Sequence, residues 1–398
     1  MNILIADKLP QPALDKLGEL GHAITYEPTL SADALGQVLN DVQTLIVRST
    51  KVPAEAIASA NALELIIRAG AGTNNIHVES ASQKGIFVTN CPGKNAVAVA
   101  ELAFGLMLAL DRRIPLANAE IKTNQWNKKE YSKAQGIMGK TLGVIGLGTI
   151  GQEVITRARG FGLNVVGWSR SLTPEKAKTL GIEYASDLQA LAARSDIISL
   201  HLAYNENTSG IIGDDFFSAL KPDAFIVNTS RGGIVDETAL LSHLEENKLW
   251  YASDVFESEP ATGNAEFNSS IAAHPRCIAT PHIGASTAQA QQAVADEAVR
   301  IINTYTEQGI ALNCVNLCEQ TPASWQLNVR HHDRVGVLAN VLGLISEANI
   351  NVEECENIIF SGASSACAKI RLGTEPTNEL LEKVKTVEHV LHTQLLSL

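Results

Sequence analysis

The amino-acid sequence predicts an α/β protein with two doubly wound parallel sheets followed by a small βαββαβ domain. Short apolar segments alternate with helical stretches from residue 1 to about residue 92, and a second series of the same kind begins after Gly139. The order of the segments changes after about residue 324. A chain of 398 residues is also too long for one hydrophobic core, which indicates two or three domains.

The first series contains the strand-like segments NILIAD, TLIVRS, LELIIRAG and IFVTN. This alternation of strands and helices implies a parallel sheet that is covered by helices on both faces. An apolar helix from Asn95 to Leu110 then joins the first series to the second. Because Glu101 interrupts it and it is too short to span a bilayer, we expect this helix to be buried.

The second series contains the strand-like segments LGVIGLG, NVVGWS, DIISLHL, AFIVNTS, YASDVF and CIATPHI. A further helix, from Thr287 to Tyr305, follows the last of these strands. A doubly wound unit of this kind commonly sends its terminal helix back to the preceding domain. We therefore expect the first domain to be discontinuous in sequence.

The last 75 residues or so have the order strand, helix, strand, strand, helix, strand, which predicts a ferredoxin-like domain. WQLNVRHH is the first strand, NVEECENIIF and SACAKIRLG are two strands around the turn SGAS, and HVLHTQLLSL is the last strand. TNELLEKVKTV is the second helix. The first helix is indicated by the spacing of Val335, Leu338, Leu342 and Ile345. One face of the third strand is apolar, at Ala366, Ala368, Ile370 and Leu372.

Composition excludes several classes of function. The formal net charge of -12 argues against a nucleic-acid-binding surface, which needs clustered Lys and Arg. The start MNILIADKLP lacks the basic region and cleavage site of a signal peptide, and no segment suggests a membrane span. The six cysteines are scattered, and no His or second Cys pair completes a metal site around Cys314 and Cys318. We expect a cytoplasmic protein without a metal.

The segment GLGTIG has the pattern of a dinucleotide-binding turn, with Gly146, Gly148 and Gly151 at the characteristic spacing. Gly-rich turns are common, but here the strand LGVI precedes the turn and the helical GQEVITRARGFG follows it. The glycines permit a tight turn and the close approach of a pyrophosphate to the helix N-terminus. The second domain is therefore predicted to be of the Rossmann type and to bind a dinucleotide.

Polar residues that could act in binding or catalysis follow several strands of the second series. Arg231 follows AFIVNTS, the acids of DVFESEP follow the next strand, and His282 follows CIAT. Ligands bind at the carboxyl ends of strands in open α/β sheets, so these residues are better candidates than isolated ones. Asp236 is expected to cap the following helix. His201 ends the strand IISLHL and is a weaker catalytic candidate, because no acid lies near it in sequence.

Six motifs together resemble the D-isomer-specific 2-hydroxyacid dehydrogenases. RAGAGTNNI, GKNAVAVAEL, GLGTIG, NTSRGGIVDE, DVFESEP and TPHIGAST occur in the order of that family and cover most of the chain. The resemblance implies a discontinuous flavodoxin-like substrate-binding domain of residues 1–94 and 287–316 and a nucleotide-binding domain of residues 95–286. Residues 324–398 resemble an ACT regulatory domain, which most members of the family lack.

The resemblance also implies a catalytic set of Arg231, Glu259 and His282. His282 takes the hydroxyl proton of the substrate as hydride leaves for the nicotinamide, and Glu259 stabilises the protonated imidazole. Arg231 holds the substrate carboxylate and the developing carbonyl oxygen. Glu257 is a rival for the acid, but the acid of the family directly precedes the proline, here Pro260.

The remaining site residues are carried over from the same resemblance. Asp254 is expected to face the nicotinamide carboxamide. The expected substrate is a phosphorylated 2-hydroxy acid, held by Arg48, Lys51, Arg68, Asn95 and Arg231. The expected cofactor-binding residues are Gly146, Gly148, Thr149, Ile150, Gly151, Ser169, Arg170, Leu202, Thr229, Ser230, Asp254, His282 and Gly284.

The end of the strand NVVGWS departs from the usual pattern for NAD. A dinucleotide-binding fold normally has Asp or Glu about twenty residues after the glycine turn, where it binds the adenosine ribose. Here Ser169 and Arg170 occupy that place. The resemblance favours NAD, whereas a Ser-Arg pair also suits the 2′-phosphate of NADP, so both cofactors stay open.

The ACT-like domain suggests a regulatory site. In related enzymes paired ACT domains bind serine, which assigns His331, Asp333 and Asn351 to an effector site in a homo-oligomer, a dimer or a tetramer. The loop more often carries Asn and Pro where this chain has Asp333 and Val335. The alternative is that the domain supports dimerisation alone.

The sequence also leaves open two alternatives to a nicotinamide-dependent dehydrogenase of a phosphorylated 2-hydroxy acid. One is an NADPH-dependent reductase of hydroxypyruvate or glyoxylate. The other is a non-catalytic NAD(H)-sensing regulator, against which the intact set of Arg231, Glu259 and His282 argues.

Overall fold

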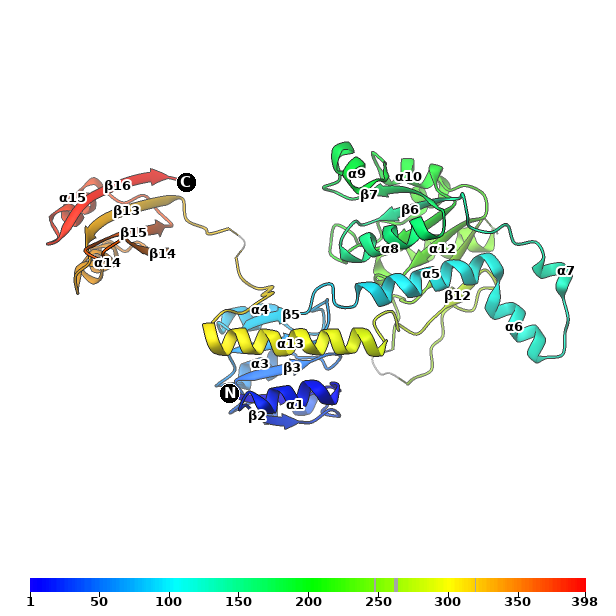
Figure 1. Ribbon diagram of the computed structural model, residues 1–398, viewed down its shortest axis with the longest axis horizontal. Coiled ribbons are helices and arrows are strands. Elements are labelled where there is room, and N and C mark those ends of the chain that lie inside the picture. The colour runs from blue at the N-terminus through cyan, green and yellow to red at the C-terminus, as the bar shows by residue number, and fades with distance from the viewer. Residues whose placement is uncertain (247, 261–263, 319) are drawn as a thin grey trace. The chain divides into compact units, whose positions relative to one another are not determined.

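A computed structural model describes residues 1–246, 248–260, 264–318 and 320–398 of the chain (Figure 1). The described residues divide into two compact units, Met1–Asn316 and Leu317–Leu398. The first unit contains two parallel sheets and the second contains one antiparallel sheet. The α/β class and the separate small C-terminal sheet predicted from the sequence are confirmed.

The first sheet has the strand order β2-β1-β3-β4-β5, and its strand pairs are parallel. Its strands are β1 (Asn2–Ile5), β2 (Ala23–Tyr26), β3 (Thr44–Val47), β4 (Leu65–Arg68) and β5 (Phe87–Asn90). The helices between them are α1 (Gln11–Glu19), α2 (Ala32–Val38), α3 (Ala54–Ser59) and α4 (Val78–Gln83).

A helix from the end of the first unit covers one face of this sheet. Helix α13 (Ala288–Gln308) contributes Val294, Ala298, Ile301 and Ile302 to a core cluster that also contains Ile3, Ile5 and Ile67 of the strands. The other face packs against α2, α3 and α4 through a second cluster. Both faces of the central strands β1, β3 and β4 are therefore buried, which explains their continuous apolar runs, whereas the edge strand β2 is largely exposed.

The second sheet has the order β12-β11-β10-β9-β6-β7-β8, and its strand pairs are also parallel. Its strands are β6 (Thr141–Ile145), β7 (Asn164–Trp168), β8 (Glu183–Tyr184), β9 (Ile197–Leu200), β10 (Ala224–Asn228), β11 (Leu249–Ser253) and β12 (Cys277–Ala279). The strand order reverses between β6 and β9, and ligands of open α/β sheets bind at such a switch point.

Helices cover both faces of the second sheet. One face packs against α5 (Ala96–Arg112) and α8 (Thr149–Gly160). The other face packs against α10 (Leu188–Arg194), α11 (Asp214–Ser218) and α12 (Glu237–Glu245), while α9 (Pro174–Leu180) follows β7. Asp236 caps α12 as expected, because its Oδ1 accepts hydrogen bonds from the amides of Thr238 and Ala239.

Two helices between α5 and β6 were not predicted from the sequence. Helix α6 (Ile114–Lys122) begins after Arg113, whose left-handed φ of 49° ends α5, and α7 (Lys128–Tyr131) follows. Neither helix buries a side chain fully, so the apolar periodicity that identifies core helices is weak in this segment.

The C-terminal unit has the order βαββαβ and the strand order β14-β15-β13-β16, which is ferredoxin-like. Its elements are β13 (Trp325–His332), α14 (Val337–Glu347), β14 (Val352–Ile359), β15 (Ser365–Leu372), α15 (Asn378–Thr386) and β16 (Val390–Ser397). Ala366, Ala368, Ile370 and Leu372 are fully buried on one face of β15, as predicted.

The expected position of Val335 was wrong. It lies before α14 and is fully exposed, so the helix begins two residues later than the apolar spacing indicated. Gly336, with a φ of 91°, precedes the helix and turns the chain sharply there.

Among the described residues, no helix combines the length and the apolar character that crossing a membrane requires.

Candidate active site

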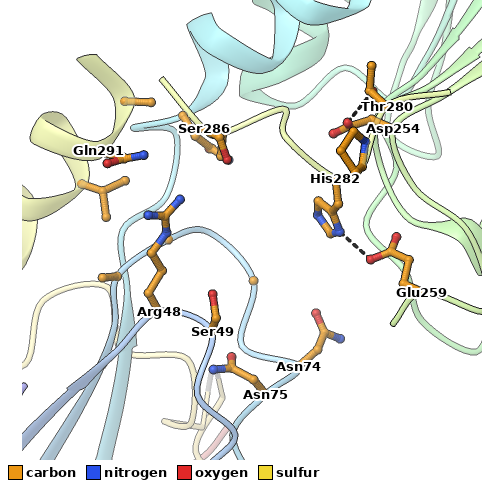
Figure 2. A pocket seen from close by; sticks show the side chains of 18 of the residues that line it. Arg48, Ser49, Asn74, Asn75, Asp254, Glu259, Thr280, His282, Ser286 and Gln291 are labelled. Atoms are coloured by element: carbon orange, nitrogen blue, oxygen red, sulfur yellow. Dashed lines mark hydrogen bonds and ion pairs between the residues drawn. The ribbon is translucent and has the colours of Figure 1, made fainter. Parts of the chain in front are cut away.

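A cavity of about 740 Å³ in the first unit is lined by residues of both parallel sheets. Figure 2 shows Arg48, Ser49, Asn74 and Asn75 on one side of it and His282 with Glu259 on the other. Arg231, Glu259 and His282, the three catalytic candidates of the sequence, all line this cavity. Four of the five expected substrate-binding residues line it as well: Arg48, Arg68, Asn95 and Arg231.

The loop that carries His282 is held by the carboxylate of Asp254, which directly follows β11. Asp254 Oδ1 accepts hydrogen bonds from the Thr280 hydroxyl (2.6 Å) and the Ile283 amide (2.8 Å). Its Oδ2 accepts a hydrogen bond from the Gly284 amide at 2.7 Å. Asp254 is 2% exposed, so these bonds connect the ends of β11 and β12 in a largely dry setting. Asp254 thus positions the His282 loop and also lines the cavity.

His282 adopts a left-handed backbone conformation with a φ of 53°. Such a φ is uncommon outside glycine, although His is among the residues that tolerate it. The hydrogen bonds to Asp254 on the residues that flank His282 offset the cost of this conformation. The result is an imidazole that leaves the strand end and enters the cavity (Figure 2).

Glu259 is the carboxylate that contacts this imidazole. His282 Nδ1 lies 2.6 Å from Glu259 Oε2, and Glu259 Oε1 accepts a hydrogen bond from the Phe256 amide at 2.9 Å. Burial works to raise the pKa of Glu259, but the hydrogen bonds from His282 and Phe256, with the charges of His282 and Arg231, lower that pKa below its usual value. The carboxylate therefore stays ionised beside the imidazole.

Glu257, the rival acid, has a different environment. Its side chain is exposed and its amide donates to Glu237 Oε1 at 2.9 Å.

Because Glu259 already occupies His282 Nδ1, the other ring nitrogen, Nε2, is left for a ligand in the cavity. An imidazole with one nitrogen on a carboxylate and the other free can take up and return a proton.

Arg231 is positioned by the turn that follows β10. A Cβ atom on the next residue, Gly232, would lie 2.1 Å from the carbonyl carbon of Phe256, so this turn packs directly against the backbone that follows β11. The Arg231 guanidinium donates to the carbonyl of Ser230 at 2.6 Å. Its Nη2 also lies close to Gly72 in the loop after β4, where a Cβ would be 2.8 Å away. Arg231 thus extends from one sheet toward the other.

Arg48 and Arg68 bring further positive charge to the cavity from the first sheet. Burial lowers the pKa of Arg68 to about 10, and the charges of Arg231 and Arg48 contribute to this shift. Nε of Arg68 is buried and has no hydrogen-bond partner among the described residues. Neighbouring guanidinium groups that repel one another, one of them with an unpaired buried Nε, indicate a place for an anion.

Asp7 fixes the loop that carries Arg48. Its Oδ2 accepts hydrogen bonds from the amides of Arg48, Ser49 and Thr50 at 2.7, 3.0 and 2.9 Å. Lys51, which the resemblance assigned to the substrate, is exposed at the end of this loop and does not line the cavity. Lys8, which the sequence analysis missed, lines it instead. Its position after β1, at the carboxyl edge of the sheet, is the signal that could have identified it.

Asn95 lies where the chain passes from one sheet to the other. It is the N-cap residue of α5, makes no side-chain cap hydrogen bond, and its Oδ1 is buried without a partner among the described residues. Asn95 also lines the cavity. An unpaired amide oxygen at this position is available to a ligand.

The expected dinucleotide-binding residues lie along the carboxyl edge of the second sheet. A Cβ on Gly151 would be 2.1 Å from the Gly146 carbonyl oxygen, and one on Gly146 would be 2.3 Å from the His201 carbonyl oxygen. Glycine is therefore required at both positions. Gly148 is the N-cap of α8, where no side chain caps the helix and no acid occupies its first turn, at Thr149 and Ile150. This uncapped N-terminus suits a pyrophosphate.

The neighbouring strands place other cofactor candidates at the same edge. Leu202 follows β9 by two residues, and Thr229 and Ser230 follow β10. Thr229 Oγ1 is buried and has no partner among the described residues, whereas the Ser230 hydroxyl donates to the Leu200 carbonyl at 2.6 Å. Gly284 lies on the His282 loop, and Ser169 and Arg170 follow β7.

His201 is not part of the catalytic arrangement. Although part of the residue is exposed, its Nδ1 is buried, and burial lowers the pKa of the imidazole to about 3. Its Nε2 lies 2.8 Å from the Ser199 hydroxyl, and the residue does not line the cavity.

The three effector candidates do not meet within one chain. His331 is buried near the end of β13, with Nε2 3.2 Å from Asn357 Oδ1, and Asp333 follows that strand. Asn351 precedes β14, at the end of the sheet where Val352 pairs with Leu372, the last residue of β15. His331 pairs with Ala366, at the opposite end of β15.

Comparison with known proteins gives the family. Residues 104–284 match the sequence profile described as D-isomer specific 2-hydroxyacid dehydrogenase, NAD binding domain. A D-3-phosphoglycerate dehydrogenase of Methanocaldococcus jannaschii is 40% identical over 319 residues, which are 80% of this chain and 60% of that protein. The chain thus spans about three-fifths of that relative.

Two further similarities cover almost the whole of the related protein. A hydroxypyruvate reductase of Thermotoga maritima is 44% identical over 284 residues, 71% of this chain and 90% of the reductase. The crystal structure of NAD+-bound 3-phosphoglycerate dehydrogenase from Entamoeba histolytica superposes with a TM-score of 0.66 at 28% identity, covering 80% of this chain and 99% of that one. The chain belongs to the D-isomer-specific 2-hydroxyacid dehydrogenase family.

Proposed function

We propose that the chain oxidises 3-phospho-D-glycerate to 3-phosphooxypyruvate with NAD, as a D-3-phosphoglycerate dehydrogenase in the first step of L-serine biosynthesis. The observation that carries this proposal is one cavity that contains the His282–Glu259 pair and three guanidinium groups from two sheets. Relatives named as D-3-phosphoglycerate dehydrogenases support the same substrate.

In this proposal His282 acts as the general base and Arg231 binds the oxygen atoms next to the reacting carbon. The hydroxyl proton of the substrate passes to His282 Nε2, the C2–H bond breaks with its electron pair, and the carbon–oxygen double bond forms. Glu259 stabilises the imidazolium that results, because its ionised carboxylate lies 2.6 Å from Nδ1. Arg231 binds the substrate carboxylate and the developing carbonyl oxygen.

The glycine turn and the uncapped start of α8 fit a dinucleotide, since the turn has no room for side chains at Gly146 and Gly151. When bound, NAD supplies the nicotinamide ring that accepts the hydride. The residues that hold the dinucleotide in this proposal are Gly146, Gly148, Thr149, Ile150, Gly151, Leu202, Thr229, Ser230 and Gly284. The unpaired hydroxyl of Thr229 is available to it.

The phosphate of the substrate is assigned to the first sheet. Arg48 and Arg68 provide guanidinium groups, and Lys8 adds an ammonium group that the sequence analysis did not include. A dianionic phosphate is well matched to such a cluster, because charge-assisted hydrogen bonds are the strong ones. Asn95 also lines the cavity, but its unpaired Oδ1 accepts hydrogen bonds, so it suits a donor such as a substrate hydroxyl and not the phosphate.

The domain organisation follows the sheets in this proposal. Residues 1–94 and 287–316 form the substrate-binding domain, residues 95–286 the nucleotide-binding domain, and residues 324–398 an ACT-like regulatory domain. Packing of α13 on the first sheet supports the discontinuous assignment. His331, Asp333 and Asn351 form the effector site between two copies, since one chain keeps Asn351 apart from the other two.

A second candidate function is reduction of hydroxypyruvate, favoured by the 44% identity to the Thermotoga maritima reductase, of which 90% is covered. Hydroxypyruvate has one anionic group, so Arg48 and Arg68 would have no role in binding it. The number of cations in the cavity therefore favours the phosphorylated substrate.

One experiment separates the two candidates. The purified chain is assayed with 3-phosphoglycerate and with D-glycerate, using NAD and following nicotinamide absorbance. The proposal expects a much higher kcat/KM for 3-phosphoglycerate, and an Arg48→Ala variant that loses this preference while retaining its rate with glycerate. Equal kcat/KM for the two acids would refute the phosphorylated substrate.

A further inference from the structure

We propose that the adenosine end of the dinucleotide site accepts a 2′-phosphate, so that the chain binds NADP(H) as well as NAD(H). This inference rests on the proposed nicotinamide-dependent function and concerns which cofactor that function uses. It depends on the residues that follow β7, the strand next to β6 in the second sheet (Figure 1).

The end of β7 adjoins the glycine turn. Ile145 of β6 pairs with Trp168 of β7, and the amide of Gly146 donates to the Trp168 carbonyl at 2.9 Å. The side chain of Leu147, in the same turn, packs over Gly167, where a Cβ would be 3.3 Å from it. Ser169 and Arg170 therefore follow the strand at the place where a dinucleotide-binding fold holds the adenosine ribose.

No carboxylate is available there to accept hydrogen bonds from a free ribose diol. The described segment 169–187 contains the acids Glu175, Glu183 and Asp187. Glu175 is bonded to Thr173, Glu183 is paired with Arg194, and Asp187 accepts from the Ala190 amide and the Ser186 hydroxyl. Each acid thus holds local structure, and none replaces the missing ribose acceptor.

Arg170 is an exposed cation that is free to bind an anion. Among the described residues its guanidinium makes no hydrogen bond and no ion pair, in contrast to the paired Arg194. The turn before α9 is fixed, because the Leu172 amide donates to the Ser169 carbonyl and Leu172 is buried. Lys176 adds a second positive charge, with Nζ 3.1 Å from the Ser171 carbonyl.

The chemistry of this end favours a phosphate over a bare hydroxyl. A carboxylate at position 169 would repel a 2′-phosphate, whereas a serine is neutral and its hydroxyl can donate. A guanidinium matches phosphate geometry with two parallel hydrogen bonds. NAD can also bind, because neither Ser169 nor Arg170 requires a phosphate for the dinucleotide to occupy the site.

The test is direct binding by the 398-residue chain, measured by titrating NADH and NADPH and following the fluorescence of the reduced nicotinamide. The wild type is expected to bind both. Arg170→Ala should weaken NADPH binding roughly 10- to 100-fold, as expected for lost charge-assisted hydrogen bonds, and NADH binding by less than about 3-fold. Ser169→Asp should likewise weaken NADPH binding selectively.

The control variant is Arg159→Ala. Arg159 lies near the end of α8 and donates to the Leu180 carbonyl, at the opposite end of the helix from the glycine turn. It should leave both affinities unchanged.

Each other outcome has a definite meaning. Binding of NADH without NADPH overturns the inference and leaves the proposed function standing. Equal losses for both cofactors in Arg170→Ala overturn the phosphate role and indicate that the guanidinium stacks on adenine. If neither reduced cofactor binds, the proposed function itself fails.

Discussion

At the scale of single residues, the geometry of the active site depends on one buried carboxylate, Asp254. Asp254 accepts three hydrogen bonds from the His282 loop, and this loop carries the imidazole into the cavity with a left-handed backbone. The strand-end rule predicted that Arg231, Asp254 and His282 would gather at one edge of a sheet. It could not predict the φ of His282, because that depends on the hydrogen bonds to a different strand.

His282→Ala should reduce kcat by roughly 10²- to 10⁴-fold, because general acid–base catalysis has about that magnitude. The affinity for NADH should change little, since the ring contacts Glu259 and the cavity rather than the glycine turn. Steady-state kinetics with 3-phosphoglycerate and a fluorescence titration measure the two quantities. Unchanged turnover would remove His282 from the mechanism.

Glu259→Gln should move the acidic limb of the pH–rate profile for oxidation to lower pH and reduce the maximal rate. Oxidation needs an unprotonated imidazole, and removing the ionised carboxylate at 2.6 Å destabilises the protonated form. The matched control is Glu257→Gln, whose exposed side chain should leave the profile unaltered. A shift in the control and none in Glu259→Gln would reverse the assignment of the acid.

At the scale of elements, the sequence predicted most strands from their apolar runs, and it failed where side-chain direction depends on distant contacts. Lys8 lines the cavity and Lys51 does not, although both follow strands of the first sheet. Asp7 fixes the backbone of the loop after β3 through three amides, a contact between distant segments that strand position alone does not reveal. Val335 fits a helical spacing but lies outside α14, since apolar spacing alone does not fix where a helix begins.

Gly151→Ala should disrupt the glycine turn, because its Cβ would lie 2.1 Å from the Gly146 carbonyl oxygen. A strain of roughly 1–3 kcal/mol in the turn corresponds to a loss of NADH affinity of about 5- to 150-fold. Gly160→Ala is the control on the same helix, since its Cβ would have no atom within 4 Å. Equal NADH affinities in the two variants would contradict this prediction.

Glu297 ties α13 to the segment between the two sheets. Hydrogen bonds from Arg300, Asn313 and Lys94 lower the pKa of this carboxylate from 4.5 to about 2. They outweigh burial, which acts to raise the pKa, since the residue is only 3% exposed. Because the folded pKa lies below the unfolded one, the stabilisation is complete above about pH 4.5 and is lost as the pH falls toward 2.

Glu297→Gln should therefore destabilise the chain by about 1–3 kcal/mol at neutral pH, the usual range for hydrogen bonds to charged groups. The difference in Tm from the wild type should shrink as the pH is lowered through the window between 4.5 and 2. Glu307→Gln, an exposed position on the same helix, is the control and should change Tm little. A Tm difference that does not vary with pH would contradict the role of the charge.

At the scale of the whole molecule, the C-terminal unit raises the question of regulation. The topology of this unit was predicted in full from the alternation of its segments, including the buried face of β15. The βαβ order also implies that Asn351, before β14, and His331, near the end of β13, lie at opposite ends of the sheet, because these two strands run parallel. Assigning both residues to one effector site within a chain conflicts with that order.

Serine should inhibit the wild type weakly, in the millimolar range, and Asp333→Asn should strengthen this inhibition. An ionised Asp333 repels the serine carboxylate, whereas an asparagine donates a hydrogen bond to it. Titration of serine against the wild type and the variant measures the effect, with the rates in the absence of serine as the control. If neither chain responds at millimolar serine, the domain is not a serine sensor.

The division of the cationic groups between two sheets also bears on how a substrate promotes its own reaction. Arg48 and Arg68 belong to one sheet and Arg231 to the other. A substrate with a negative group at each end would therefore contact guanidinium groups of both sheets at once. Part of its binding energy would then align the two sheets relative to each other. An acid with one anionic group, such as glycerate, cannot contact both sets of guanidinium groups at once. We therefore expect a lower kcat for glycerate as well as weaker binding, because its reacting atoms would be less well aligned.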